Sequence, residues 1–287
     1  MMRRLAAFGT VLALTVSARA EPQQTARVGD AYEITSDRES SFTTALGGTG
    51  SSTDRDEMIE RVIGVSDAGV EIEYDLPANA TANDRELGWQ FPARVLKSAD
   101  GSLRLLNTAD MEVRLATWLK LAKLPKSACG HYYFTWNLFR VECDPQSVLP
   151  ALRALDLRPR DLRDGGSYRD PDAAGATMFM RTARTSGITY VAEMAVDPDT
   201  VRRELAQGDV ALGEISRKPV TYEAALEKAR ATRVSGTISV TFEVDAANNV
   251  KRRVKVTKLE MEKPGEKVER RTTTETLDRR RLAANER

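Results

Sequence analysis

Hydrophobic and polar residues alternate along several short stretches of the chain, which is typical of strands with one buried face. The alternation is clear over 70–76, where valine, isoleucine, tyrosine and leucine are separated by acidic residues. The turn-forming sequence 66–69 joins this stretch to the apolar residues of 59–65. We therefore predict an antiparallel hairpin with one acidic, solvated face.

The same reasoning predicts a second hairpin from 89 to 107 around the turn 98–101, and an earlier strand over 31–40. The stretch 43–56 is rich in glycine, serine and threonine and shows no alternation, so we expect a long loop there. Near the C-terminus, the mostly polar stretch 267–276 predicts an edge strand whose charges discourage pairing with another sheet.

The clearest hairpin is predicted over 238–256, where apolar and polar residues alternate on both sides of a short loop. The apolar faces of its two strands coincide only if Val244 lies opposite Val250, which requires a loop with an odd number of residues. This register also places Glu243 opposite Lys251 as a favourable cross-strand pair.

Helices are predicted in the middle of the chain. An apolar stripe runs through 109–124, with Thr108 as the N-cap and Pro125 at the end. The region 158–175 is rich in Arg, Asp, Gly and Pro and is expected to be a linker or surface loop. Further helices are predicted over 145–155, 198 to about 207, and 221–232, with a strand over 188–196.

Strands joined by tight turns, with helices grouped between them, indicate an α+β fold: a mainly antiparallel, curved sheet with a helical middle segment packed on it. Residues 21–287 are expected to form a single domain. Its predicted parts are strand-rich over 28–107, helical over 108–165, mixed over 166–235 and strand-rich over 236–277.

Residues 1–20 have the composition of a secretory signal peptide. Two arginines precede an uncharged stretch at 5–16, and the small residues Ala18 and Ala20 come just before Glu21. The apolar stretch is much shorter than the ~20 residues that span a bilayer. We expect an exported protein, periplasmic or extracellular; a buried N-terminal helix is the alternative.

Cys129 and Cys143 are the only cysteines, and export favours a disulfide between them, worth ~3 kcal/mol in the chain-entropy model. An unbroken helix would hold them ~21 Å apart, whereas a disulfide needs Cα atoms within about 7 Å. The segment between them is therefore predicted to turn back on itself. Two free thiols are the alternative.

The segment 129–143 also holds most of the candidate functional residues. It contains the single histidine and five of the seventeen aromatic residues in the chain. One interpretation is an aromatic patch that stacks on a sugar ring, lipid or peptide; the other is that the aromatic residues fill the core near the disulfide. The candidate ligand-binding residues are His131, Tyr132, Tyr133, Phe134, Trp136 and Phe139.

Known catalytic and metal-binding motifs are missing from the sequence, so we predict no cofactor and no metal site. A single histidine excludes any site that needs two imidazoles, and there is no CxxC, GxSxG or DxDxDG pattern. The glycine-rich stretch 47–52 lacks the lysine of a phosphate-binding loop. In 161–172, acids are interleaved with arginines, which favours internal ion pairs over calcium binding.

Charge is balanced overall but unevenly distributed. The chain has 43 Lys+Arg and 42 Asp+Glu, which argues against a nucleic-acid partner, and 30% charged residues argue against an integral membrane protein. Residues 21–100 contain sixteen acids and seven bases, whereas 251–287 contain seven acids and thirteen bases. Either these two regions pair in the sheet, or the basic tail 277–287 is mobile and binds an anionic partner.

Three functional hypotheses follow. The first is a non-catalytic, exported binding protein for an apolar or amphipathic ligand such as a lipid. The second is a structural or adaptor protein of the cell envelope that acts through its basic C-terminal strands. The third is an exported hydrolase that uses His131 as a general base.

Overall fold

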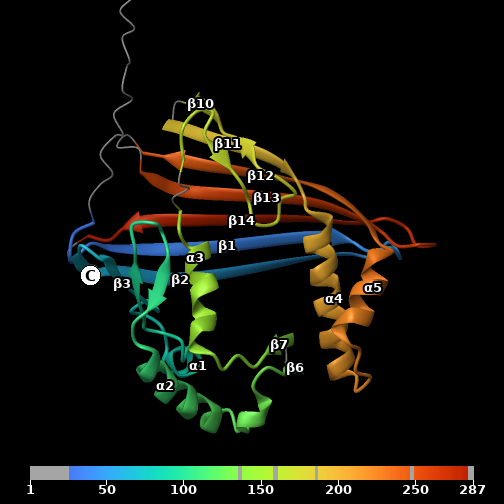
Figure 1. Cartoon of the computed structure of the whole chain (residues 1–287), viewed down its shortest axis with the longest axis horizontal. Coiled ribbons are helices and arrows are strands. Elements are labelled where there is room, and N and C mark those ends of the chain that lie inside the picture. Colours follow the sequence, from blue (N-terminus) through green and yellow to red (C-terminus); the bar gives the residue numbers. More distant parts are fainter. Residues whose placement is uncertain (1–25, 135–137, 158–160, 185–186, 246–248, 284–287) are drawn as a thin grey trace, which may run out of the picture.

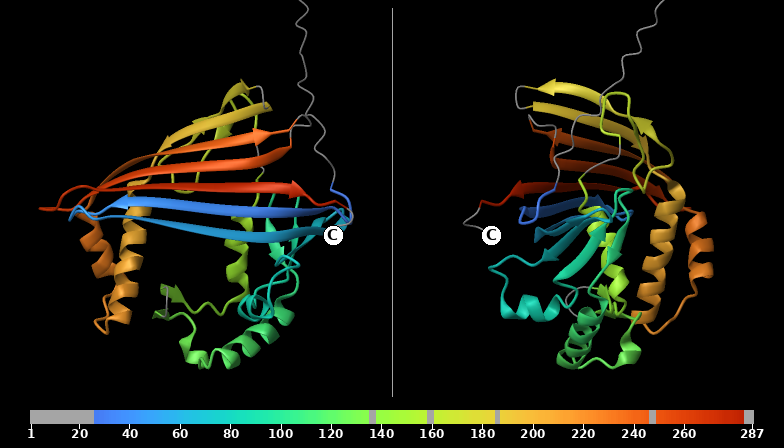
Figure 2. Two further views of the ribbon diagram at one scale, coloured as in Figure 1. Left: turned by 180° about the vertical axis from the view of Figure 1, so that it is seen from behind. Right: turned by 60° about the vertical axis from the view of Figure 1, so that its left-hand side comes forward.

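The computed structural model describes residues 26–134, 138–157, 161–184, 187–245 and 249–283. Within them, one antiparallel ten-stranded sheet dominates, and helices cover parts of one face, which we call the inner face (Figures 1 and 2). The predicted α+β class and the large curved antiparallel sheet are confirmed. The predicted signal peptide, 1–20, lies outside the described residues.

Neighbouring strands in the sheet come from distant parts of the chain. In spatial order they are β10 (Met180–Arg184), β11 (Gly187–Ala195), β12 (Arg233–Val244), β13 (Val250–Glu262), β14 (Glu269–Arg281), β1 (Ala31–Thr43), β2 (Thr49–Ser66), β3 (Gly69–Asp75), β4 (Ala93–Lys97) and β5 (Leu103–Leu105). Two small pairs lie apart: β6 (Tyr132–Phe134) with β7 (Leu138–Arg140), and β8 (Ser167–Tyr168) with β9 (Thr177–Met178).

The last strand, β14, is central in the sheet, so the predicted edge strand over 267–276 is wrong. It pairs with both β13 and β1, and thereby joins the two strand-rich ends of the chain. Opposite charges meet at this junction, because Arg280 donates to Glu33 at 3.0 Å and Arg279 donates to Glu60 at 2.6 Å. The described part of the basic tail, through Leu282, is thus paired in the structure instead of free for a partner.

The expected long loop over 43–56 is also wrong, because β2 begins at Thr49 and only a short turn separates it from β1. The first half of β2 is exposed on both faces, so its sequence shows no apolar alternation. Position 50 requires glycine, because the ring of Phe42 lies over it and a Cβ there would come within 2.4 Å of that ring.

The hairpins predicted over 59–76 and 89–107 are confirmed as β2–β3 and β4–β5. The third is confirmed in outline, since Val244 pairs with Val250. A bulge between Glu243 and Val244 then shifts the register, so the backbone of Glu243 lies opposite Arg252. The apolar faces therefore do not coincide. The predicted charge pair still forms, because the Glu243 carboxylate lies 3.8 Å from Nζ of Lys251.

The bulge turns Lys255 onto the buried inner face, opposite Val240. Its Nζ donates to Asp170 at 2.8 Å and to Asp172 at 2.6 Å, and its side chain is 11% exposed. Two carboxylates from the loop 169–173 thus compensate the desolvation of the ammonium group. Within 161–172, an acid pairs with an interleaved arginine at Asp161, 2.6 Å from Arg163, whereas Asp170 and Asp172 pair with a lysine outside the segment.

The helical middle is confirmed, with some changed boundaries. Asn107, not Thr108, is the N-cap of the first long helix, and the helix after Asp197 extends well beyond 207. In this longer helix, Gly213 packs against the carbonyl of Lys218, where the chain turns back. The helices are α1 (Ala82–Leu87), α2 (Thr108–Leu121), η1 (Lys126–Ala128), η2 (Pro145–Ser147), α3 (Val148–Ala154), α4 (Pro198–Ile215) and α5 (Tyr222–Arg230).

Two hydrophobic cores lie against the inner face. The first core packs strands β1 and β3–β5 against α2 and α3, and the second packs β11–β13 against the loop that carries β8 and β9. Val250 packs against both cores. Among the described residues, no helix is long and apolar enough to cross a lipid bilayer.

Candidate functional site

The predicted disulfide joins Cys129 and Cys143, whose Cα atoms are 5.5 Å apart. The chain between them turns back as expected, since Tyr132–Phe134 pairs with Leu138–Arg140. At the base of this hairpin, Gly130 and Val141 continue the pairing through a backbone hydrogen bond of 2.8 Å. The disulfide therefore closes a hairpin that stands apart from the main sheet.

The predicted aromatic residues are only partly accounted for. Tyr133 and Phe139 stack with ring centroids 6.3 Å apart, and Phe139 is 37% exposed. Tyr132 and Tyr133 are half-buried. Trp136 lies outside the described residues, and Phe134 is placed only as part of the strand β6. Ligand binding by this group stays a prediction.

His131 connects the hairpin to a helix. Its Nδ1 lies 2.6 Å from Oε1 of Glu214 in α4, and its side chain is 60% exposed. Within the described chain, Glu214 is the side-chain partner of His131, and no serine or threonine hydroxyl bonds to it. The third member that a hydrolase triad requires is therefore not in place among these residues.

A cavity of about 730 Å³, which we call the end cavity, lies elsewhere, on the inner face where β1 begins and β14 ends. None of its lining residues comes from 129–143. Its floor is apolar and buried, and it includes Val62, Ile72 and Tyr74. The exposed turns Ser66–Gly69 and Ser98–Gly101 form its rim, so the cavity leads from solvent into the first core.

Fixed charges accompany this apolar floor. Glu60 accepts from Arg279 at 2.6 Å and from the Tyr74 hydroxyl at 3.4 Å, and Arg279 also lies 3.4 Å over the Tyr32 ring. Burial, followed by the nearby Glu60 carboxylate, raises the pKa of Tyr74 well above its usual value. The phenol thus stays neutral and donates to the carboxylate.

Two more ion pairs border the end cavity. Lys97 Nζ lies 2.6 Å from Asp156, in the segment that follows α3, and Asp30 bonds to Arg281. The segment Leu155–Leu157 crosses beneath the sheet here and forms the wall opposite the strands. The charged groups at the base of the cavity are therefore paired with one another.

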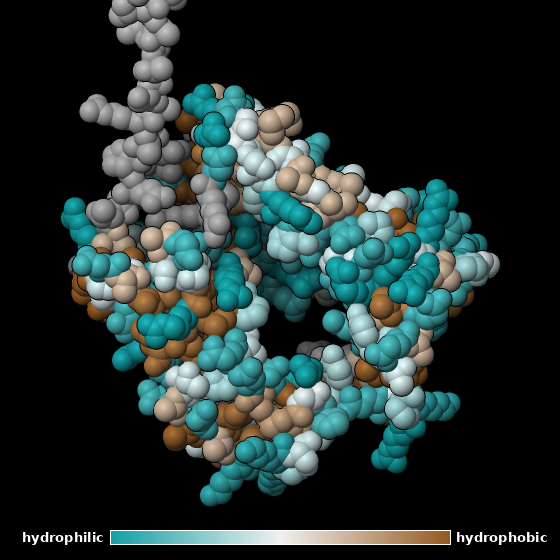
Figure 3. Space-filling view, in the orientation of Figure 1, coloured by the Kyte–Doolittle hydropathy of each residue, from teal (hydrophilic) through white to brown (hydrophobic). Residues whose placement is uncertain are grey.

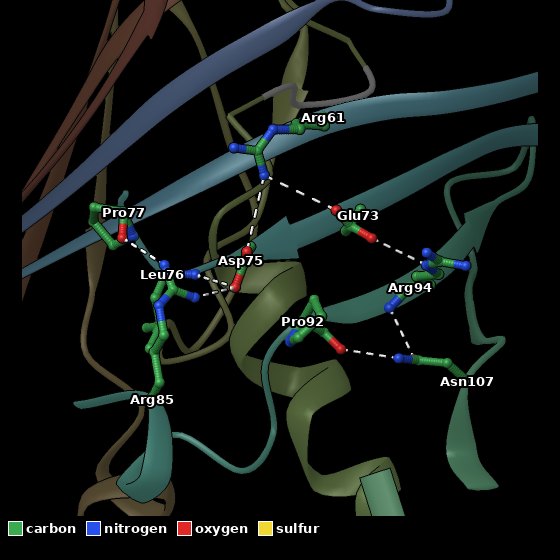
Figure 4. A network of polar contacts seen from close by, with 9 residues as sticks. All are labelled: Arg61, Glu73, Asp75, Leu76, Pro77, Arg85, Pro92, Arg94 and Asn107. Carbon is green, nitrogen blue, oxygen red and sulfur yellow. Dashed lines mark hydrogen bonds and ion pairs between the residues drawn. The ribbon is translucent and has the colours of Figure 1, made fainter. Parts of the chain in front are cut away.

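The outer face of the same strands is held by another polar network (Figure 4). Glu73 lies 3.0 Å from Arg94 and 3.9 Å from Arg61, while Asp75 lies 3.5 Å from Arg85 of α1. Asn107 links β4 to the start of α2 through Pro92 and the Arg94 amide. This network fixes the strands that form the floor of the end cavity.

The space-filling view shows the surroundings of these elements (Figure 3). Hydrophobic residues gather over the region of β3 and α1–α3, and an opening lies between this region and α4, edged mostly by hydrophilic residues. The end cavity was not predicted from the sequence, because its lining comes from six separate segments. The available signal was the complementary charge of the N-terminal and C-terminal strands.

Comparison with known proteins assigns no family: no family model and no curated protein matches the chain. Two solved structures show weak likeness. One describes lipid–protein interactions in lipovitellin, with 11% identity and a TM-score of 0.35, over 90% of this chain and 26% of the lipovitellin chain. The other is an outer membrane channel from Pseudomonas putida F1, with 8% identity and a TM-score of 0.22, over 91% and 100% of the two chains.

Proposed function

We propose that the protein is an exported, non-catalytic binding protein that holds an amphipathic ligand in the end cavity. The observation that carries this proposal is the cavity itself, of about 730 Å³, with a buried apolar floor that includes Val62 and Ile72. Cavities of roughly 300–1,000 Å³ are the usual sites for small ligands. This one combines an apolar floor with charged and polar side chains at its base and rim, which suits an amphipathic ligand.

The charges support binding over catalysis. Glu60, Asp156, Lys97 and Arg279 are joined in ion pairs of 2.6 Å, so each group is already engaged by an opposite charge. An acid, base or nucleophile that works on a substrate must instead face it with its reactive atom. Export is supported by the composition of residues 1–20 and by the disulfide.

The proposal is tested with the neutral fluorescent amphiphile N-phenyl-1-naphthylamine and the purified, oxidised protein from residue 21 onward. We expect saturable binding. Val70→Trp, at a half-buried lining position, should weaken it at least about tenfold because the indole fills the cavity. Ala99→Trp, at the exposed rim, is a second blocking variant that spares the core.

The matched control is Val113→Trp on α2, where the valine is 69% exposed and does not line the cavity. Circular dichroism establishes that all variants are folded. Unchanged probe affinity in both blocking variants, or equal loss in the control, contradicts the proposal. Native mass spectrometry of gently purified protein adds a second readout, the mass of any co-purified ligand.

A further inference from the structure

Two basic residues end the two longest described helices in the left-handed backbone conformation. Lys123 follows α2 with φ +55° and Arg217 follows α4 with φ +56°, and they are the only non-glycine residues with positive φ in the part of the chain that the structure describes. In both places the amide of the next residue donates to the carbonyl five positions before it, at 2.9 and 2.8 Å. Glycine is usual at this position, because a Cβ is strained there. The chain therefore keeps a basic side chain where glycine would be more stable.

These two helix ends lie close together. Nδ1 of His131 is 2.6 Å from Oε1 of Glu214, which ties the segment after α2 to the last turn of α4. Figures 1 and 2 show the end of α2 and the turn between α4 and α5 on the side of the molecule that faces away from the sheet. We call this surface the basic end; its basic residues are Lys120, Lys123, Lys126, Arg217 and Lys218.

The five basic side chains of the basic end are available to a partner. All are exposed, and none has an ion pair or a side-chain hydrogen bond with another described residue. Acids are few nearby: the sequence 113–141 holds five bases and no acid, Glu214 is bonded to His131, and Glu223 begins the next helix. The basic end is therefore positive in a chain whose total charge is nearly balanced.

Large apolar side chains are exposed beside these bases. Val113 and Leu121 on α2 and Leu212 on α4 are each more than half exposed, and Val220 follows the basic turn after α4. Val113 lies two helical turns before Lys120, so the two side chains share one face of α2. Bases next to exposed apolar side chains are typical of a surface that lies on an anionic bilayer, where the apolar groups enter the headgroup layer.

We infer that the basic end docks the protein on a lipid bilayer that contains anionic phospholipids. The lysines and arginine contact the headgroups, while the apolar side chains of α2 and α4 enter the interface between them. This role also gives a reason for the strained backbone at Lys123 and Arg217, since strain is kept where a side chain serves binding. The inference goes beyond the proposed function, because it does not depend on a ligand in the end cavity.

The test is co-sedimentation of the purified, oxidised protein from residue 21 onward with lipid vesicles. Vesicles of phosphatidylcholine alone are compared with vesicles that contain about 30% phosphatidylglycerol. At low salt we expect at least about tenfold stronger binding to the anionic vesicles. This preference should shrink in about 0.5 M salt, because exposed charges are screened.

The double variant Lys123→Gly/Arg217→Gly should bind anionic vesicles at least about tenfold more weakly, although its thermal unfolding midpoint should be equal or higher. A residue kept only for the stability of the helix end would give the opposite change in the midpoint. Lys258→Gln/Lys267→Gln is the control: it removes two charges from exposed positions outside the basic end and should keep the binding.

Leu121→Ser/Leu212→Ser tests the apolar part and should weaken binding to anionic vesicles at least about threefold. Unchanged binding in this variant would mean that the bases bind an acidic macromolecule and not a lipid surface, which overturns the inference. Equal binding to both kinds of vesicle, or equal loss in the glycine and glutamine double variants, also overturns it. Failure of N-phenyl-1-naphthylamine to bind would instead contradict the proposed function and leave this result unaffected.

Discussion

Four aromatic rings fill the space over the inner face in the second core, whereas the first core leaves the end cavity open beside it. Tyr168, Phe179 and Phe242 lie with ring centroids 5.1 to 5.6 Å apart, and Tyr190 lies 6.2 Å from Phe179. Aromatic rings at these separations fill volume efficiently. The end of the first core is instead covered by Leu155–Leu157 and by ion pairs.

The difference lies in what the covering segments contribute. The loop with β8 and β9 brings Tyr168 and Phe179 onto the sheet, while Asp170 and Asp172 neutralise the buried Lys255. The segment after α3 brings Asp156, whose pairing with Lys97 fixes the wall without filling the space. One sheet therefore supports a closed core at one place and an open cavity at another.

The largest effect is expected from Phe242→Ala, which removes a ring that is 2% exposed. The free energy of unfolding should fall by about 4 kcal/mol, because the substitution loses both apolar burial and packing. Phe139→Ala, in the disulfide hairpin, is the control and should cost less than about 1 kcal/mol. Urea unfolding measures both values, and similar losses at the two positions would show that the second core is not tightly packed.

Lys255→Met is expected to cost about 3 kcal/mol, because it leaves Asp170 buried without its cation. Adding Asp170→Asn should restore at least about 1 kcal/mol, since the uncompensated charge is removed. Lys258→Met, an exposed lysine of the same strand, should change stability by no more than about 0.5 kcal/mol. If the double variant is no more stable than Lys255→Met, buried charge is not the cause.

A smaller, pH-dependent effect is expected from Tyr168 in the second core. Burial, with the nearby Asp170, raises the pKa of Tyr168 to about 12. The unfolded chain releases this proton near pH 10. The raised pKa therefore contributes fully to the free energy of unfolding below pH 10, and this contribution is lost as the pH rises toward 12. The loss is at most about 1.4 kcal/mol per pH unit, and less where the phenol is partly solvated.

Tyr168→Phe removes this contribution but leaves the other alkaline effects, including the raised pKa of Tyr74, in both proteins. Urea unfolding at pH 8.5, 10 and 11 should therefore show a shallower decline for Tyr168→Phe than for the unchanged protein. Parallel declines would mean that the phenol of Tyr168 titrates at its ordinary pKa.

Local patterns predicted the features that depend on short-range physics. Period-two alternation identified β3 because only one of its faces is buried, and the cysteine spacing identified the turn of 129–143 because a disulfide limits the Cα distance. The pairing of Val244 with Val250 followed from the same rule. The bulge could not be predicted from this rule. It depends on Lys255, whose buried ammonium group is stabilised by carboxylates more than eighty residues away in the chain.

The errors concern strands that are polar on both faces. The stretch 267–276 looked like an edge because nothing in its own sequence shows that acidic strands from the N-terminus will pair with it. The first half of β2 was missed because it buries little apolar surface. The end cavity could not be predicted, since no single segment contributes enough of its lining to leave a pattern.

The smallest expected effect is a difference of about 1 kcal/mol between the costs of the same substitution in the two cores. Val240→Ala removes methyl groups from a fully enclosed site, whereas Val62→Ala removes them from a side chain that already borders the end cavity. At the enclosed site, the substitution creates a new void and loses contacts on every side. We therefore expect the free energy of unfolding to fall by about 2 kcal/mol for Val240→Ala and by about 1 kcal/mol for Val62→Ala. Saturation with N-phenyl-1-naphthylamine should enlarge the cost at Val62 and leave the cost at Val240 unchanged. The bound probe contacts the methyl groups that Val62→Ala removes, so it binds the variant more weakly and stabilises it less. Equal costs without ligand would mean that the floor of the end cavity is as tightly packed as the second core.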